Sequence, residues 1–121
     1  MSMFKRLSGF FTGPSPEEIS AAKTKAEALI KENGVVVFSK SYCPYCASTK
    51  RSLNKLGANY VLLELNEIDD GRALQSALQE LTYQTTVPNI FIQQKHIGGN
   101  SELQDIKDEL PQLLRGAGAL S

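Results

Sequence analysis

The chain has no tryptophan, one histidine, two cysteines and no long apolar run, and each scarcity excludes a class of protein. No apolar stretch approaches the roughly 18 residues that a membrane-spanning helix needs, so we expect no membrane partner. Two cysteines are too few for the disulfide framework of a small secreted domain. Two cysteines and one histidine also leave a structural zinc site without its four ligands unless carboxylates join, so we expect no metal.

The chain carries no net charge, because 13 Lys and Arg residues balance 13 Asp and Glu residues. This balance removes the electrostatic footprint of a nucleic-acid binder, so we expect no nucleic-acid partner. The composition, with 41% hydrophobic and 21% charged residues, is that of an ordinary globular protein. A length of 121 residues fits one domain, which we expect to be a monomer.

Both ends of the chain read as extensions of a domain over residues 15–115. Residues 1–14 contain Lys5 and Arg6 but no acidic residue, and residues 116–121 are small and glycine-rich; we expect both segments to be flexible. The N-terminal segment has no apolar core of the length that a secretory signal needs and no clear cleavage site. The sequence therefore favours a cytoplasmic protein, with mitochondrial targeting by residues 1–14 as the weaker alternative.

The order of predicted elements indicates an α/β fold. Ser15, Pro16 and Glu18 form the start signal of a helix that ends at Asn33-Gly34. Further helices are expected from Cys43 or Pro44 to Leu56, from Asp69 or Asp70 to residue 81, and from Asn100 or Ser101 onward. Pro111 is expected to kink or restart this last helix.

Apolar and β-branched runs predict four strands between these helices, over residues 35–39, 60–65, 87–92 and 96–97. The first two runs lack alternation and are predicted to be buried on both faces. A helix joins these two strands, which makes them parallel, whereas a tight turn at residues 93–95 makes the last two antiparallel. The prediction is a four-stranded mixed sheet with helices on both faces.

The two cysteines, Cys43 and Cys46, lie within four residues at the expected start of a helix. Free backbone N–H groups and the helix dipole favour an anion there, so Cys43 should have a lowered pKa and Cys46, one turn inside, should be more buried. From Asn33 to Leu63 the chain has four cations and no acidic residue, which also favours a thiolate. A structural disulfide across so short a loop would stabilise little. The pattern favours a redox-active dithiol.

Three separated motifs resemble one known family. Cys43-Pro44-Tyr45-Cys46 follows Lys40, Thr86-Val87-Pro88 comes later, and Gly98-Gly99-Asn100-Ser101 comes last. In this order they resemble a dithiol glutaredoxin of the CPYC type, within the thioredoxin superfamily, over roughly residues 15–114. The resemblance implies a thioredoxin fold.

The resemblance also implies an activity, that of a glutathione-dependent thiol–disulfide oxidoreductase. Cys43 would attack protein–glutathione mixed disulfides, and Cys46 would resolve the intermediate, so that protein disulfides are reduced as well. Glutathione would be the co-substrate, with glutathione reductase and NADPH upstream. The alternative is an iron–sulfur module in which Cys43 residues of two chains and two glutathiones hold the cluster, although Pro44 stands where cluster-binding members usually have Ser or Gly.

The family's glutathione contacts, carried over to this sequence, fall on separate segments. Lys40 and Gln84 would serve the glycine carboxylate, a cis Val87-Pro88 bond would expose a backbone for the cysteinyl unit, and the segment at 99–102 would take the γ-glutamyl end. The full set is Lys40, Tyr45, Gln84, Thr86, Val87, Pro88, Gly99, Asn100, Ser101 and Glu102. His96, on an expected edge strand, is assigned to packing or solvent exposure and not to catalysis.

Three positions depart from the family pattern. Tyr83 replaces a common Gly, Thr85 replaces a common Lys or Arg, and Glu102 replaces the usual Asp. The first two flank Gln84, so they bear on how the glycine carboxylate is held. The third bears on any contact with the glutathione amine.

Overall fold

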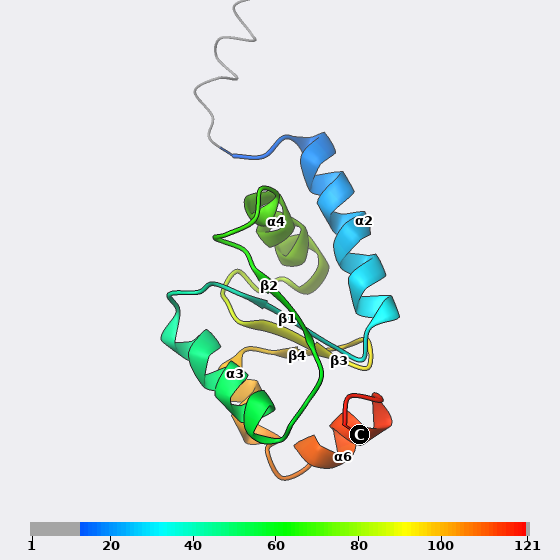
Figure 1. Ribbon diagram of the computed structural model, residues 1–121. Coiled ribbons are helices and arrows are strands. Elements are labelled where there is room, and N and C mark those ends of the chain that lie inside the picture. Colours follow the sequence, from blue (N-terminus) through cyan, green and yellow to red (C-terminus); the bar gives the residue numbers. More distant parts are fainter. Residues whose placement is uncertain (1–12, 121) are drawn as a thin grey trace, which may run out of the picture.

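The computed structural model describes residues 13–120, and the N-terminal segment predicted to be an extension lies almost wholly outside this range. The described chain is a sheet with helices on both sides (Figure 1). The strand order is β2-β1-β3-β4, with β1 parallel to β2 and antiparallel to β3, and β3 antiparallel to β4. The predicted four-stranded mixed sheet is therefore confirmed. Its elements are α2 (Pro16–Glu32), β1 (Val35–Ser39), α3 (Pro44–Lys55), β2 (Val61–Glu64), α4 (Gly71–Thr82), β3 (Asn89–Ile92), β4 (Lys95–Gly98), α5 (Asn100–Asp105) and α6 (Leu110–Gly116).

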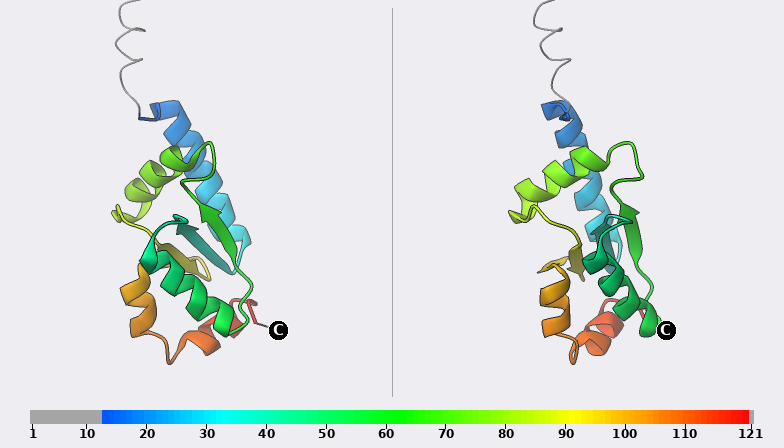
Figure 2. Two further views of the ribbon diagram at one scale, coloured as in Figure 1. Left: turned by 60° about the vertical axis from the view of Figure 1, so that its left-hand side comes forward. Right: turned by 90° about the vertical axis from the view of Figure 1, so that its left-hand side faces the viewer.

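Alternation along β1 divides the core into two layers. Val36 and Phe38 pack with α2 and α4, whereas Val35 and Val37 pack with α3, α5 and α6. The views of Figure 2 show the same division of helices between the two faces. Because all five residues of β1 are buried, the strand that leads into Cys43 is fixed from both sides.

Local signals set most of the element boundaries. The Ser15 hydroxyl accepts a hydrogen bond from the Glu18 N–H at 3.1 Å, and the Glu18 carboxylate accepts one from the Ser15 N–H at 3.0 Å, which completes the predicted capping box. Asp70 is the N-cap of α4, but its carboxylate pairs with Lys25 of α2 at 2.7 Å instead of capping. This ion pair joins the two helices that cover one face of the sheet.

Of two sequence predictions about individual elements, one was wrong and one is confirmed. The strand over 60–65 was expected to be buried on both faces, yet β2 is an edge strand and Leu62 is 38% exposed. Pro111 was expected to kink or restart the last helix, and it restarts it: α5 and α6 are separate helices, and Pro111 lies in the first turn of α6. A proline lacks the N–H that a helix interior needs, so it begins a new helix here.

The C-terminal segment, for which a flexible tail was predicted, packs against the domain within the described range. Ala119 is buried, and its carbonyl oxygen accepts a hydrogen bond from the Asn59 N–H at 2.8 Å. A side chain at Gly34 would collide with the backbone oxygen of Ala117. Residues 117–120 therefore cover the start of β1.

Candidate functional site

The two cysteines lie at the junction between β1 and α3, where the sequence placed them. Cys43 is the N-cap of α3, Pro44 is the first helical residue, and Cys46 lies in the first turn. Pro44 costs no hydrogen bond there, because the first helical N–H groups have no partner within the helix. Both thiols are free: Cys43 is partly exposed, whereas Cys46 is fully buried.

The environment of Cys43 favours its thiolate. Burial alone raises its pKa, but hydrogen bonds from the Cys46 backbone and side chain and from the Tyr45 backbone, with the charge of Lys40, outweigh burial and leave the pKa below its ordinary value. The thiol also lies 3.7 Å from the Val87 carbonyl oxygen, as a donor to it. Cys43 is therefore a partly exposed sulfur that ionises easily, as predicted.

Cys46 has the opposite character. Burial raises its pKa above the ordinary value, although a hydrogen bond from the Ser39 side chain and one from the Lys40 backbone act to lower it. The Lys40 N–H lies 3.5 Å from the Cys46 sulfur. At neutral pH the pair thus consists of an outer thiol that ionises readily and an inner thiol that stays protonated.

A groove of about 660 Å³ borders the thiols. It brings together segments from the start of α3, the residues before β3 and the start of α5. Eight of the ten residues predicted to contact glutathione line it, and it also includes two residues that the sequence did not single out, Gln104 and Asp105. These two lie one helical turn beyond the predicted segment on α5, where helical periodicity could have indicated them. The eight are Tyr45, Thr86, Val87, Pro88, Gly99, Asn100, Ser101 and Glu102.

The Val87-Pro88 peptide bond is cis, as the family resemblance implied. Gln84 supports the backbone on both sides of this bond, since its side-chain amide donates to the carbonyl oxygens of Thr86 at 2.9 Å and Pro88 at 2.8 Å. The Gln84 side-chain oxygen lies 3.1 Å from His96 Nε2. Gln84 is thus engaged within the protein and does not line the groove.

The start of α5 is tied to α3 and to its own first turn. The Asn100 side-chain oxygen accepts hydrogen bonds from the buried Thr49 hydroxyl at 2.9 Å and from Gln104 at 3.2 Å. The Glu102 carboxylate accepts one from the Gly99 N–H at 2.7 Å. The N-cap of α5 is Gly99, and not Asn100 or Ser101 as predicted. With these side chains occupied, the Ser101 hydroxyl and the first N–H groups of α5 are left to face the groove.

Lys40 does not line the groove. It lines, with Tyr42, a separate hollow of about 430 Å³ beside the start of α4. Lys50, one of the cations that the sequence placed near the cysteines, pairs with Glu64 at 2.8 Å and is mostly buried. The charge of Lys40 lowers the Cys43 pKa, whereas the charge of Lys50 is paired with Glu64 of β2.

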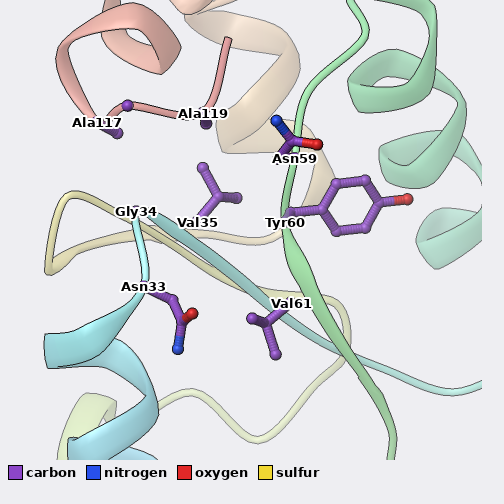
Figure 3. Close-up of a pocket in the computed structure, with 9 residues that line it drawn as sticks. Asn33, Gly34, Val35, Asn59, Tyr60, Val61, Ala117 and Ala119 are labelled. Atoms are coloured by element: carbon purple, nitrogen blue, oxygen red, sulfur yellow. The ribbon is translucent and has the colours of Figure 1, made fainter. Parts of the chain in front are cut away.

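Another pocket, of about 230 Å³, lies at the far end of β1 from the cysteines (Figure 3). It is lined by the turn before β1, by residues 59–61 and by the C-terminal segment, and none of the predicted site residues reaches it. Within residues 13–120, no three His, Cys, Asp or Glu side chains gather as metal ligands would. No helix in that range has the length and apolarity to cross a membrane.

Comparison with known proteins identifies the same family that the sequence motifs resemble. The family model described as Glutaredoxin matches residues 35–97, which hold both cysteines and the cis proline. The chain belongs to the glutaredoxin family. A glutaredoxin from Ricinus communis is 50% identical over 101 residues, which cover 82% of this chain and 99% of that protein. Glutaredoxin-C1 from Arabidopsis thaliana is 46% identical over 109 residues, with coverage of 88% and 87%.

Solved glutaredoxin structures share the fold as well. The crystal structure of a buckwheat glutaredoxin–glutathione complex superposes with a TM-score of 0.85 at 41% identity, covering 89% of this chain and 100% of that one. The solution structure of reduced glutaredoxin C1 from Populus tremula x tremuloides gives a TM-score of 0.79 at 44% identity, with coverage of 85% and 90%. The protein therefore has the thioredoxin-like fold of glutaredoxins and is a glutathione-dependent thiol–disulfide oxidoreductase.

Proposed function

We propose that this glutaredoxin reduces protein–glutathione mixed disulfides through the Cys43 thiolate, and protein disulfides through Cys43 and Cys46 together. The observation that carries the proposal is the unequal pair: Cys43 is partly exposed with a lowered pKa, whereas Cys46 is buried with a raised pKa. A thiolate is the nucleophile in disulfide exchange, so the outer sulfur attacks first.

The first step is an exchange at the glutathione sulfur. The Cys43 thiolate forms a bond to that sulfur while the bond between glutathione and the protein substrate breaks, and the substrate leaves as a thiolate. Cys43 then carries glutathione in a mixed disulfide. In one route, a second glutathione attacks the glutathione sulfur of this intermediate, which releases oxidised glutathione and restores the Cys43 thiolate. In the other route, the Cys46 sulfur attacks the Cys43 sulfur, which forms the Cys43–Cys46 disulfide and releases reduced glutathione.

The groove supports a binding mode for glutathione that begins at the cis proline. The backbone of Val87 faces Cys43, so it is placed to pair with the cysteinyl unit of the tripeptide. From there the groove leads to the first turn of α5, where the Ser101 hydroxyl and free N–H groups suit the γ-glutamyl carboxylate. Lys40 would act on the glycine end. The buckwheat neighbour, solved as a glutathione complex, supports this use of the site.

Turnover of a glutathionylated peptide tests the mechanism directly. Wild type and Cys46→Ser should both release the peptide, because that step needs only Cys43, and Cys43→Ser should be inactive. Reduction of a protein disulfide should be lost in both variants. Peptide turnover that persists in Cys43→Ser would contradict the proposal.

The alternative function is the iron–sulfur module, in which Cys43 of two chains and two glutathiones ligate the cluster. Pro44, fixed in the first helical position, stiffens the segment that would have to open for a cluster. Anaerobic reconstitution with iron, sulfide and glutathione, followed by absorbance and size-exclusion chromatography, separates the two functions. A coloured dimer that depends on glutathione would support the module, and a colourless monomer would dismiss it.

We further propose that the protein works as a cytoplasmic monomer, supplied with reduced glutathione by glutathione reductase and NADPH. The length, which fits one domain, and the ordinary globular composition suit a monomer. Size-exclusion chromatography measures the oligomeric state. Imaging of fluorescent fusions with and without residues 1–14 measures the location, and mitochondrial signal that depends on those residues would contradict it.

A further inference from the structure

The face of the sheet that α3 covers carries a mostly buried carboxylate, Glu64, with no role in the proposed mechanism. Glu64, the last residue of β2, pairs through Oε2 with Lys50 of α3. Its other oxygen, Oε1, is buried and has no hydrogen-bond partner in the described part of the chain. A buried carboxylate oxygen without a donor is costly, so its retention calls for an explanation.

The sheet places this carboxylate on the same face as the Cys46 thiol. Val61 and Leu63 pack into the α2–α4 layer, so Glu64 points to the opposite face, toward α3. Ser39 is the register partner of Glu64 on β1, and it is fully buried. Neighbouring strands are about 4.8 Å apart, which brings the two side chains within reach of each other.

Ser39 links this carboxylate to the thiol. Its hydroxyl is near enough to the Cys46 sulfur to act as a hydrogen-bond donor that lowers the pKa of that thiol. The hydrogen bond that its hydroxyl donates to the Lys40 carbonyl oxygen is long, at 3.4 Å, so the hydroxyl hydrogen is weakly held. Because Ser39 and Glu64 are register partners on the same face of the sheet, the hydroxyl hydrogen can turn from the Lys40 carbonyl oxygen toward the Glu64 carboxylate. Lys50 lies one helical turn after Cys46 on the same face of α3 and holds the other carboxylate oxygen in place.

We propose that Glu64 accepts, through the Ser39 hydroxyl, the proton that Cys46 gives up when its sulfur attacks the mixed disulfide on Cys43. The Cys43–Cys46 bond forms, the bond from Cys43 to glutathione breaks, and glutathione leaves as a thiolate with the electron pair. The Cys46 proton passes to the Ser39 oxygen as the Ser39 proton passes to Glu64 Oε1. The cysteine pair is oxidised and glutathione is reduced.

The surroundings of Cys46 offer no other acceptor of this kind among the described residues. On its own helix it faces Cys43, which is in the mixed disulfide at this step, and the cation Lys50. β1 presents Ser39 and no charged side chain, while β2 presents Glu64, with Tyr60 acting on Lys50. Because burial holds the Cys46 thiol protonated at neutral pH, an internal acceptor would speed the step.

The experiment follows one turnover of the reduced protein with a glutathionylated peptide by rapid mixing. Peptide release reports the attack of Cys43, and glutathione release reports the attack of Cys46. In Glu64→Gln, glutathione release at pH 7 should slow about tenfold or more, while peptide release is unchanged. The deficit should shrink as pH rises, since hydroxide then removes the proton. Ser39→Ala should behave like Glu64→Gln, and the exposed Glu67→Gln, three residues along the chain, should match wild type.

This inference rests on the proposed function, and the same experiment separates the two. No peptide release from wild type would mean that the proposed function is wrong. Normal peptide release together with unchanged or faster glutathione release in Glu64→Gln would overturn only the role of Glu64. A faster rate would show that freeing Lys50 to stabilise the Cys46 thiolate is the larger effect. If Glu64→Gln fails to fold, Ser39→Ala decides by the same two rates.

Discussion

The carbonyl oxygen of Val87 lies 3.7 Å from the Cys43 sulfur, although the two residues are 44 positions apart in the chain. One comes from the loop before β3 and the other from the start of α3. This contact joins the reactive sulfur to the backbone that forms one wall of the groove. A disulfide substrate that reaches Cys43 therefore meets the Val87 backbone at the same time.

The charge of Lys40 should be measurable in the reactivity of Cys43. Because the Cys43 pKa is lowered, its thiolate persists to lower pH than that of an ordinary cysteine and is lost as the pH falls through that lowered pKa. The charge of Lys40 lowers this pKa less than the hydrogen bonds from Cys46 and Tyr45 do, so Lys40→Gln should move the alkylation profile modestly to higher pH. Alkylation at pH 6 should slow about two- to threefold, read by mass spectrometry of the Cys43 peptide. Lys55→Gln, at the far end of α3, is the control, and an unmoved Lys40→Gln profile would contradict the assignment.

The Ser101 hydroxyl should contribute to glutathione affinity. If it donates to the γ-glutamyl carboxylate, Ser101→Ala removes a hydrogen bond to a charged group and should raise KM for a glutathionylated peptide roughly tenfold, with little change in kcat. Ser20→Ala, on the exposed side of α2, should leave KM as in wild type. A KM for Ser101→Ala equal to that of wild type would place the carboxylate elsewhere.

Gln84 should matter for stability. Its amide satisfies two carbonyl oxygens, those of Thr86 and Pro88. Gln84→Ala should lower the free energy of unfolding by about 1–3 kcal/mol, measured by urea denaturation. Gln79→Ala, at an exposed position on α4, should change it by less than about 0.5 kcal/mol. Equal values for the two variants would show that the loop does not depend on these hydrogen bonds.

Tyr83 sits in a backbone conformation that suits glycine. It ends α4 with φ of 63°, and its side chain is 90% exposed, so the ring contributes little packing. Tyr83→Gly should raise the free energy of unfolding by roughly 0.5–1 kcal/mol, because the strain of a left-handed residue with a Cβ is removed. Tyr83→Ala keeps the Cβ and should give no such gain. A stabilised Tyr83→Ala would assign the effect to the ring instead.

The sequence predicted those features that depend on neighbours in the chain. The start of α3 at Cys43 and Pro44, the capping box at Ser15 and Glu18, and the turn between β3 and β4 all follow from residues within a few positions of each other. The unequal roles of the two cysteines followed for the same reason, because one helical turn separates an exposed N-cap from a buried position.

Features that depend on distant partners could not be predicted. The edge position of β2 is set by strand order, which its own apolar residues do not reveal. Gln84 was predicted to serve glutathione, and its spacing does not reveal that His96 of β4, 12 residues later, comes within 3.1 Å of its side-chain oxygen. Lys50 was grouped with the cations around the thiols, although Glu64, 14 residues later, neutralises it. Each outcome depends on tertiary contacts that spacing does not encode.

β1 lies between β2 and β3 in the sheet, and this position determines what happens if the polypeptide is divided into two fragments. The half of the chain with β1, α3 and β2 carries the cysteines, whereas the half with the cis proline, β3 and α5 carries most of the groove, and the two halves meet where β1 pairs with β3. A break in the loop around residues 66–67, which is exposed, would leave each fragment with an incomplete reaction centre. Thiol turnover by two such fragments would then report their reassembly, so this small domain could serve as a split reporter of association between proteins fused to its halves.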